Sequence, residues 1–194
     1  MCGIAGIIGG QDSRSAKADV GGMLDVLRRR GPDDVGVESW DRAVLGHRRL
    51  SIVDLSQAGH WPMAFEDGKL AVVFNGMIYN FLELRQELEA TGCRFRSRTD
   101  TEVLLHGYRE WGADRLATKL QGMFAVRIWD ETAGKLYLIR DRLGVKPLVF
   151  SNKGGEIVFA STVRAVHSVH GGQLSVDGVA DYLECGFLTD SHAT

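Results

Sequence analysis

The second residue of the chain combines two groups that catalysis can use. Cys2 follows the initiator Met1, so removal of Met1 leaves one residue that carries both a thiol and a free α-amino group. Typical pKa values of about 8.5 for a thiol and about 7.7–8.0 for an α-amine make the amine a workable base near neutral pH. Pairing a side-chain nucleophile with the N-terminal amine is a known route to covalent catalysis. Cys2 could equally be a small apolar residue that opens a core strand.

Other positions carry residues suited to binding or catalysis, and each also has a structural interpretation. Arg48 and Arg49 lie in a short apolar segment, and one of the two guanidinium groups could face a pocket. Asn75-Gly76 ends a buried apolar run, but Asn-Gly is also the strongest short hairpin-turn signal. Asp100 lies in the first turn of an expected helix, where a carboxylate also interacts favourably with the helix dipole.

The composition indicates one globular domain and gives no sign of a nucleic-acid or membrane partner. The chain has 194 residues, of which 44% are hydrophobic and 25% are charged, with a formal net charge of -2. This length suits a single domain with a sizeable core, and the balanced charge creates no attraction to nucleic acid or acidic membrane. No apolar run approaches the length of a membrane span and the N-terminus lacks a signal-peptide pattern, so we expect a cytoplasmic protein.

The cysteines fit neither a disulfide framework nor a metal site. Cys2, Cys93 and Cys185 are odd in number and far apart in the sequence, unlike paired disulfide cysteines or a CxxC-type zinc motif. We therefore expect no metal ion, and we interpret Cys93 and Cys185 as structural residues.

The N-terminal part of the chain is expected to begin with a buried strand and a helix. Residues 4–8 are apolar, and Gly3 and Gly6 would let another backbone or a ligand approach closely. The helix covers 13–30 and ends at a Gly-Pro pair. Further strands are expected over 43–49, 50–54 and 70–74.

Helices are expected in the middle of the chain. Asn80 with Glu83, and Thr99 with Glu102, have the spacing of capping boxes, in which each side chain satisfies a free backbone N–H at a helix start. Apolar residues follow at helical spacing in both segments, and a third short helix covers 113–120.

The C-terminal half changes to strands, which we interpret as one antiparallel meander. Short helices near 163–168 and 176–184 follow the strands. Helices between groups of strands predict an α+β layered sandwich rather than a doubly wound parallel sheet, and no GxxxxGKS or GxGxxG phosphate loop is present. The strands of this half are expected over 123–130, 135–140, 148–151 and 156–160.

Several spaced motifs carry a resemblance to a known family, and together they are more specific than any single motif. They are Met1-Cys2-Gly3-Ile4-Ala5-Gly6, Arg30-Gly31-Pro32-Asp33, Gly46-His47-Arg48-Arg49-Leu50-Ser51-Ile52-Val53-Asp54, Asn75-Gly76-Met77-Ile78-Tyr79-Asn80, Arg98-Thr99-Asp100-Thr101-Glu102 and Arg140-Asp141-Arg142-Leu143-Gly144-Val145-Lys146-Pro147-Leu148. In this order they resemble the class II glutamine amidotransferase domain of the N-terminal nucleophile hydrolases, as found in glutamine-hydrolysing asparagine synthetases. The match covers essentially the whole chain. It implies a four-layer αββα sandwich with two antiparallel sheets.

The resemblance implies a covalent mechanism for glutamine hydrolysis. The Cys2 thiolate would attack the side-chain amide carbon of glutamine while its own α-amine takes and returns the proton, which gives a γ-glutamyl thioester and ammonia. The family match assigns the stabilisation of the developing oxyanion to the Asn75 side-chain amide and the Gly76 backbone N–H. Water then releases glutamate.

The resemblance also assigns residues to the two charged ends of glutamine. Arg49 would bind the α-carboxylate, with Arg48 as the second choice, and Asp100 would bind the α-ammonium. Asparagine synthetases usually have a glutamate after Asn-Gly that helps to hold this ammonium, whereas this chain has Met77. Backbone groups near Leu50, Ile52 and Val53 would complete the substrate pocket.

Residues 1–194 are thus expected to form a single glutaminase domain, and the synthetase domain that uses the ammonia is absent from this sequence. We expect the chain to be a fragment of a longer protein, with a synthetase domain as partner in cis or in trans. The chain itself would need no cofactor, because ATP and Mg²⁺ belong to the synthetase reaction. Glutamine is the expected small-molecule partner, and a homodimer is compatible with the sequence.

Two other functions remain open at this point. A different N-terminal-cysteine amidohydrolase would share Cys2 and the layered fold, although it would not explain Arg49 together with Asp100. A non-catalytic module that binds an amino acid or a protein partner would keep Met1 attached, since a retained methionine blocks the α-amine of Cys2.

Overall fold

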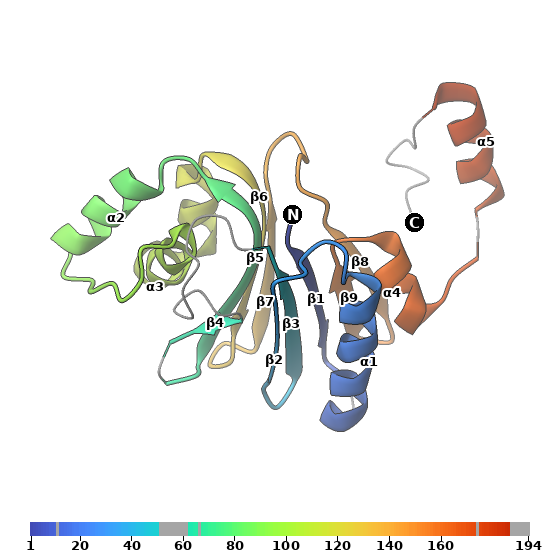
Figure 1. Ribbon diagram of the computed structural model, residues 1–194, viewed down its shortest axis with the longest axis horizontal. Coiled ribbons are helices and arrows are strands. Elements are labelled where there is room, and N and C mark those ends of the chain that lie inside the picture. Colours follow the sequence, from blue (N-terminus) through green and yellow to red (C-terminus); the bar gives the residue numbers. More distant parts are fainter. Residues whose placement is uncertain (11, 51–61, 66, 174, 187–194) are drawn as a thin grey trace.

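Antiparallel β-sheets lie face to face at the centre of the molecule (Figure 1). The computed structural model describes residues 1–10, 12–50, 62–65, 67–173 and 175–186. Within these ranges the larger sheet has the order β2-β3-β1-β9-β8, and all neighbouring strands are antiparallel. Its strands are β1 (Gly3–Ile8), β2 (Asp34–Ser39), β3 (Ala43–Arg49), β8 (Val149–Lys153) and β9 (Glu156–Ala160).

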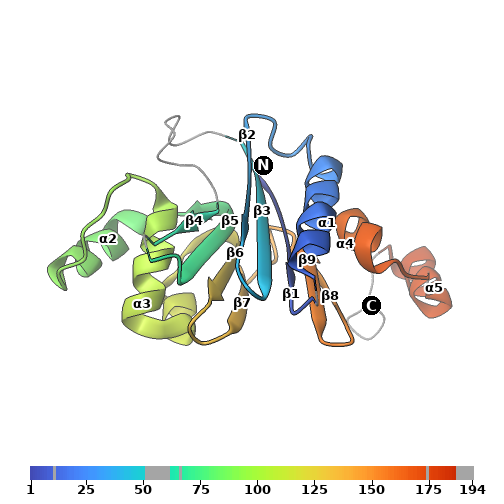
Figure 2. The ribbon, with the colours of Figure 1, turned by 90° about the horizontal axis from the view of Figure 1, so that it is seen from below.

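The smaller sheet has the order β4-β5-β6-β7 over the same described residues, again antiparallel throughout. Its strands are β4 (Met63–Ala64), β5 (Leu70–Ile78), β6 (Gly122–Asp130) and β7 (Lys135–Arg140). Helices cover the outer faces of both sheets, as Figure 2 shows from below. They are α1 (Ser13–Val26) and α4 (Val163–His170) on the larger sheet and α3 (Asp100–Lys119) on the smaller one. Helix α2 (Phe81–Ala90) packs beside α3, and α5 (Val176–Cys185) lies beyond α4.

Alternation of side chains along the strands creates a separate core between each pair of layers. On β1, Ile4 and Ile8 face the smaller sheet, whereas Ala5 and Ile7 pack with residues of α1. The central strands are therefore buried on both faces, which explains their continuous apolar runs. The expected αββα sandwich of two antiparallel sheets is confirmed for the described residues.

The glycines of β1 allow close packing, as the sequence predicts. A Cβ at Gly6 would lie 2.4 Å from the ring of Phe159, on the neighbouring strand β9. The phenyl ring thus occupies the space that a side chain at position 6 would need, and a larger residue there would displace it.

The expected meander in the C-terminal half is wrong. Strands β6 and β7 pair in the smaller sheet, whereas β8 and β9 pair in the larger sheet, where β9 lies beside β1. The sequence pattern predicts four successive strands, but it does not reveal that the loop between β7 and β8 crosses from one sheet to the other. Strand β2 was also missed, because its residues Asp34–Ser39 are largely polar and exposed.

Several local expectations need correction. The hairpin turn at Asn75-Gly76 does not form, because β5 continues through both residues to Ile78. Neither capping box forms: the Asn80 and Thr99 side chains make no cap hydrogen bond to the helices that follow them.

Helix boundaries are otherwise close to those expected. Helix α1 ends at Val26 rather than at residue 30, and the two helices expected around Gly112 form α3 with a kink at that glycine. The strand expected over 50–54 falls mostly outside the described residues. In the described part of the chain, no helix is long and apolar enough to cross a membrane.

Candidate active site

A pocket of about 410 Å³ opens between the two sheets and the start of α3. Its walls come from the residues before β1, the end of β3, the second half of β5 and the first turn of α3. This arrangement brings together residues as far apart in the sequence as Met1 and Lys146. The pocket is lined by Met1, Cys2, Arg49, Leu50, Phe74, Asn75, Gly76, Met77, Thr99, Asp100, Thr101, Met123 and Lys146.

Cys2 is fixed at the edge of this pocket by the strand that follows it and by neighbouring backbone groups. The Leu50 N–H donates to the Cys2 sulfur at 3.4 Å, and the thiol lies 3.8 Å from the Leu50 carbonyl oxygen. The Arg30 Nε donates to the Cys2 carbonyl oxygen at 3.1 Å. The nucleophile expected from the sequence is therefore half-buried, held in place and in contact with the pocket.

The electrostatic environment of Cys2 keeps its thiol protonated while Met1 is attached. Burial raises the pKa of the Cys2 thiol above its ordinary value, and the Leu50 N–H, the N-terminal ammonium, Arg49 and Arg30 oppose that rise only in part. A neutral thiol is a poor nucleophile, so reaction at neutral pH requires a base within reach.

Met1 occupies part of the space where a base would act. Its side chain lines the pocket, and its sulfur lies 3.5 Å from Lys146 Nζ. Removal of Met1 would free the α-amine of Cys2 at the pocket wall and would enlarge the pocket.

Asn75 carries an unpaired donor in the same pocket. Its side chain is 1% exposed, and its Nδ2 has no hydrogen-bond partner among the described residues. Leaving a buried donor unpaired costs about 1–3 kcal/mol, so such a group usually has a purpose. A donor that is held ready but unsatisfied in the resting state is suited to an oxyanion that forms only during reaction.

Gly76 follows on β5, and its lack of a side chain is required by the strand opposite. A Cβ at this position would lie 2.1 Å from the Met123 carbonyl oxygen and 2.6 Å from the Phe124 Cα on β6. Gly76 therefore allows β5 to remain paired with β6 while its backbone borders the pocket.

The two candidate arginines lie in different surroundings. Arg49 is buried and lines the pocket. Arg48 points to the other side of the sheet, where its Nε donates to the Leu24 carbonyl oxygen and its Nη2 forms an ion pair of 3.0 Å with Asp25. Arg48 thus anchors α1, and it does not line the pocket.

Asp100 closes the opposite wall. The Ile78 N–H donates to Asp100 Oδ2 at 3.1 Å, and the Thr101 hydroxyl lies 3.5 Å from Asp100 Oδ1. Burial raises the pKa of Asp100 above its ordinary value, although these hydrogen bonds lower it in part. A buried carboxylate that is short of countercharge is a suitable partner for a ligand ammonium group.

Of the other residues that the resemblance implies, some line the pocket and some are not among the described residues. Leu50 and Met77 line the pocket, and Met77 remains 37% exposed on β5 beside Met123 of β6. Ile52 and Val53 lie outside the described residues.

Two basic residues near Cys2 had no assigned role in the sequence, although both lie inside the quoted motifs. Arg30 contacts the Cys2 backbone, and the turn that carries it needs Gly31, where a Cβ would lie 2.4 Å from the Arg48 carbonyl oxygen. Lys146 is buried in the pocket wall, and the N–H groups of Val145 and Lys146 donate to Asp141. Both residues belong to motifs that were recognised in the sequence, but only the fold shows that Arg30 contacts Cys2 and that Lys146 lines the same pocket.

The remaining cysteines behave differently from each other. Cys93 packs against the core between α3 and the smaller sheet, in agreement with a structural role. Cys185 is exposed at the end of α5, so the expected structural role does not apply to it. Within the described ranges, no group of at least three His, Cys, Asp or Glu residues is arranged to hold a metal ion.

Comparisons with known proteins agree with this geometry. The family model of the glutamine amidotransferase domain matches residues 1–194. The glutamine-hydrolysing asparagine synthetase 3 of Bacillus subtilis is 40% identical to this chain over 169 residues, which cover 86% of this chain and 27% of the relative. A putative glutamine-hydrolysing asparagine synthetase 2 of Methanocaldococcus jannaschii is 34% identical and covers 100% of this chain and 41% of that relative.

A solved structure of the glutamine phosphoribosylpyrophosphate amidotransferase from Bacillus subtilis superimposes with a TM-score of 0.71 at 25% identity. The match covers 84% of this chain and 42% of that one. This chain thus spans less than half the length of these relatives. The full-length family match, together with a pocket that gathers the motif residues, establishes that the chain belongs to the glutamine amidotransferase domain family.

Proposed function

We propose that this chain hydrolyses glutamine to glutamate and ammonia through a γ-glutamyl thioester on Cys2. The observation that carries the proposal is the convergence of four groups on one pocket: the Cys2 sulfur, the unpaired Asn75 Nδ2, Arg49 and Asp100. A nucleophile, an oxyanion donor, a cation and an anion are the groups that amide hydrolysis of an amino acid requires.

The first half of the reaction forms the thioester and releases ammonia. After Met1 is removed, the α-amine of Cys2 takes the thiol proton, and the sulfur attacks the side-chain amide carbon of glutamine. Negative charge moves to the amide oxygen, where Asn75 Nδ2 and the Gly76 N–H stabilise it. The protonated amine then gives its proton to the leaving nitrogen, the C–N bond breaks, and ammonia departs.

The second half returns the enzyme to its starting state. The α-amine, neutral again, takes a proton from a water molecule as that water attacks the thioester carbon. The same donors stabilise the second oxyanion, and the C–S bond breaks to give glutamate. The proton held by the amine then passes to the Cys2 thiolate.

Charge complementarity supports an amino acid as the substrate. The Arg49 guanidinium suits the planar α-carboxylate, and Asp100 suits the α-ammonium. A bound ammonium would also favour the ionised form of Asp100, which burial alone disfavours. Backbone groups near Leu50, and Ile52 and Val53 beyond it, would complete the binding of the substrate.

The ammonia would be used by a synthetase domain, in an asparagine synthase-like reaction. This part of the proposal rests on the relatives, which carry that name and are much longer than this chain. We infer that residues 1–194 are a glutaminase domain that works with a synthetase domain in cis or in trans. ATP and Mg²⁺ would act there and not in this chain.

Helix α5 offers a surface for such a partner. Its apolar side chains face outward, and Leu183 is 79% exposed. An exposed apolar face on a helix that lies at the edge of the fold is typical of an interface with another protein surface. A synthetase domain seated there would bury Val176, Val179, Tyr182 and Leu183.

The decisive experiment is to identify the mature N-terminus and to measure ammonia release. Mass spectrometry of the protein purified from cells should find Cys2 as the first residue. That protein should release ammonia from glutamine, and Cys2→Ala should abolish the release without loss of folding. Cys185→Ala is the matched control, because Cys185 is exposed and lies outside the pocket.

Two outcomes would point to the other functions. If Met1 stays on the protein in cells, the α-amine of Cys2 is blocked and a non-catalytic amino-acid-binding or partner-binding module becomes the better description. If Cys2 is needed for the cleavage of other amides while glutamine is ignored, the chain is a different N-terminal-cysteine amidohydrolase.

A further inference from the structure

A larger pocket, of about 540 Å³, lies beside the N-terminal half of α3. It is bounded by β4, by the segment 92–97 and by the first half of α3, and it shares no lining residue with the pocket around Cys2. Its lining residues are Met63, Ala64, Phe65, Gly92, Cys93, Arg94, Arg96, Ser97, Glu102, Leu105, His106 and Arg109.

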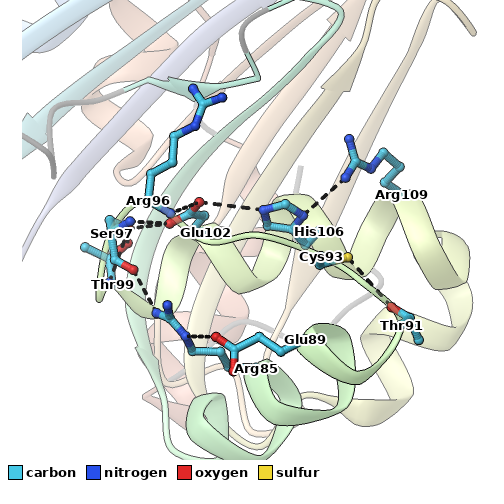
Figure 3. Close-up of polar contacts among 10 residues, drawn as sticks. All are labelled: Arg85, Glu89, Thr91, Cys93, Arg96, Ser97, Thr99, Glu102, His106 and Arg109. Carbon is cyan, nitrogen blue, oxygen red and sulfur yellow. Dashed lines mark hydrogen bonds and ion pairs between the residues drawn. The ribbon is translucent and has the colours of Figure 1, made fainter.

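Glu102 holds one wall of this pocket rigidly (Figure 3). Its carboxylate accepts hydrogen bonds from the Arg96 N–H at 2.8 Å, the Ser97 N–H at 2.7 Å and the Ser97 hydroxyl at 2.7 Å. Burial would raise the pKa of Glu102, but these hydrogen bonds and His106 outweigh it and lower the pKa overall. The Glu102 carboxylate is therefore ionised, and its oxygens are held by N–H and O–H groups of the wall.

His106 forms the next part of the wall as a neutral ring. It is buried between Phe65 and Phe95, with ring centroids 5.0 and 4.5 Å away. Burial lowers the pKa of His106, and Glu102 restores it only in part. Arg109 can only donate, so His106 Nδ1 accepts from Arg109 Nη2 at 3.4 Å, and the ring N–H lies on Nε2, 3.6 Å from Glu102.

Arg109 is thus oriented from two sides. The neutral His106 accepts one of its N–H groups, and its guanidinium stacks on the Phe65 ring at 4.4 Å. Neither contact supplies negative charge. Among the described residues, no carboxylate lies within ion-pair distance of Arg109 or of Arg94, which borders the same pocket.

The rest of the lining is apolar. Met63, Phe65 and Leu105 supply the hydrophobic part of the pocket, next to the Arg94 and Arg109 side chains. A cavity of this size that is lined by apolar side chains and a few charged ones is typical of a small-molecule site. Guanidinium groups favour carboxylate and phosphate oxygens, which they can bind in a bidentate way.

We propose that the pocket between β4, residues 92–97 and α3 binds a small organic anion, with its phosphate or carboxylate on Arg94 and Arg109 and its apolar part against Met63, Phe65 and Leu105. The site is separate from the one that handles glutamine. It contacts the same helix, however, because Ser97 and Glu102 tie the wall of this pocket to the turn that carries Asp100.

Calorimetric titration of the full chain with phenyl phosphate, benzoate and inorganic phosphate tests the proposal. Phenyl phosphate or benzoate should bind more tightly than inorganic phosphate, because only the first two fill the apolar wall. Whichever of the two binds more tightly identifies the anionic group. The double variant Arg94→Gln, Arg109→Gln should weaken that binding at least about tenfold, since hydrogen bonds to charged groups contribute on that scale.

The matched control is the double variant Arg98→Gln, Arg115→Gln. All four arginines are exposed, but Arg98 and Arg115 do not line the pocket, so this variant removes the same charge and should bind as the wild type does. Binding should also persist in Cys2→Ala and in excess glutamate. The proposal is overturned if neither organic anion binds, if both double variants weaken binding equally, or if glutamate displaces the probe.

Discussion

Removal of the Asn75 side chain should separate catalysis from stability. In the resting protein, Asn75 Nδ2 is buried without a hydrogen-bond partner among the described residues, so it contributes little to the fold through that group. During reaction the same N–H would face the oxyanion. Asn75→Ala should therefore lower kcat strongly while it leaves the folded state nearly as stable as before.

The expected sizes follow from these two roles. Losing one oxyanion donor typically lowers the rate about 100- to 1,000-fold, which corresponds to about 2.7–4 kcal/mol of transition-state stabilisation. Truncation in the core costs stability because it leaves a cavity, but it also removes an unpaired donor whose burial costs about 1–3 kcal/mol. The two effects on folding oppose each other, so the net change in unfolding free energy should be small.

The assay is steady-state ammonia release from glutamine, together with thermal unfolding of the same protein. Asn80→Ala is the control, because the Asn80 side chain donates to the Lys119 carbonyl and accepts from the Gln121 N–H outside the pocket. The control should lose stability and keep kcat. If Asn75→Ala instead unfolds more easily and keeps kcat, Asn75 is a structural residue and the assignment of the oxyanion site is wrong.

Other changes test the remaining parts of the site. Asp100→Asn should raise the KM for glutamine about 10- to 100-fold in steady-state assays. Burial raises the pKa of Asp100 above its ordinary value of 3.8, so Asp100 becomes protonated at a higher pH than an exposed aspartate does. When the pH is lowered, the wild-type KM should therefore begin to rise at that higher pH. Met77→Glu should lower that KM by adding a second carboxylate near the ammonium, and an unchanged or higher KM would mean that Met77 lies away from the substrate. Gly76→Ala should reduce both the melting temperature and activity, since its Cβ would meet the Met123 carbonyl at 2.1 Å. The pKa of Glu102 is held below its ordinary value of 4.5, so its ionised form stabilises the fold above that pH, and this contribution is lost as pH falls. Glu102→Gln should therefore lower Tm at pH 7 by about 2–4 °C for each kcal/mol of stability lost. The variant's Tm should also change less than that of the wild type as the pH is lowered.

Much of the fold could be predicted because its signals are local. The buried strands can be recognised in the sequence as apolar runs, and α2 and α3 can be recognised by apolar residues at helical spacing. The partners of those elements are not local. Nothing in residues 148–160 distinguishes a hairpin that continues the smaller sheet from one that joins β1, where the Phe159 ring packs against Gly6.

The capping boxes failed for a similar reason. Glu102 has the right spacing to reach back to Thr99, but its carboxylate is satisfied by Arg96 and Ser97 instead. Asn80 likewise joins the end of α3 to its own segment through Lys119 and Gln121. The competing partners are in the preceding loop for Glu102 and at the distant end of α3 for Asn80, and the spacing of a capping box does not reveal either of them.

Only part of the candidate site could be predicted from the sequence. Residue type and position could suggest Cys2 as a nucleophile, whereas the roles of Asn75 and Asp100 were implied only by the resemblance to the amidotransferase family. The choice between Arg48 and Arg49 needs the alternation of β3, which sends one side chain to α1 and the other to the pocket. The position of Lys146 needs the hydrogen bonds that Asp141 accepts from the loop that carries it.

The place of β1 in the sheet explains how the N-terminal segment can hold the proposed nucleophile, Cys2, in a fixed position. Terminal residues are usually the least ordered part of a domain. Here the strand that begins at Gly3 is paired on both sides, with β3 along Gly3–Ile8 and with β9 along Ala5–Ile8. Cys2 therefore follows directly from a strand buried in the middle of the larger sheet.

The same arrangement makes the site depend on contacts between distant parts of the chain. β9 lies about 150 residues after β1, and the Ile4 N–H donates to the Ser161 hydroxyl. Such long-range pairing forms late, because the entropy of closing the loop must be overcome first. We therefore expect the position of Cys2 to depend on the docking of β9 beside β1. A variant that loosens β9, such as Phe159→Ala, should lower ammonia release at temperatures below those that unfold the helices around the smaller sheet.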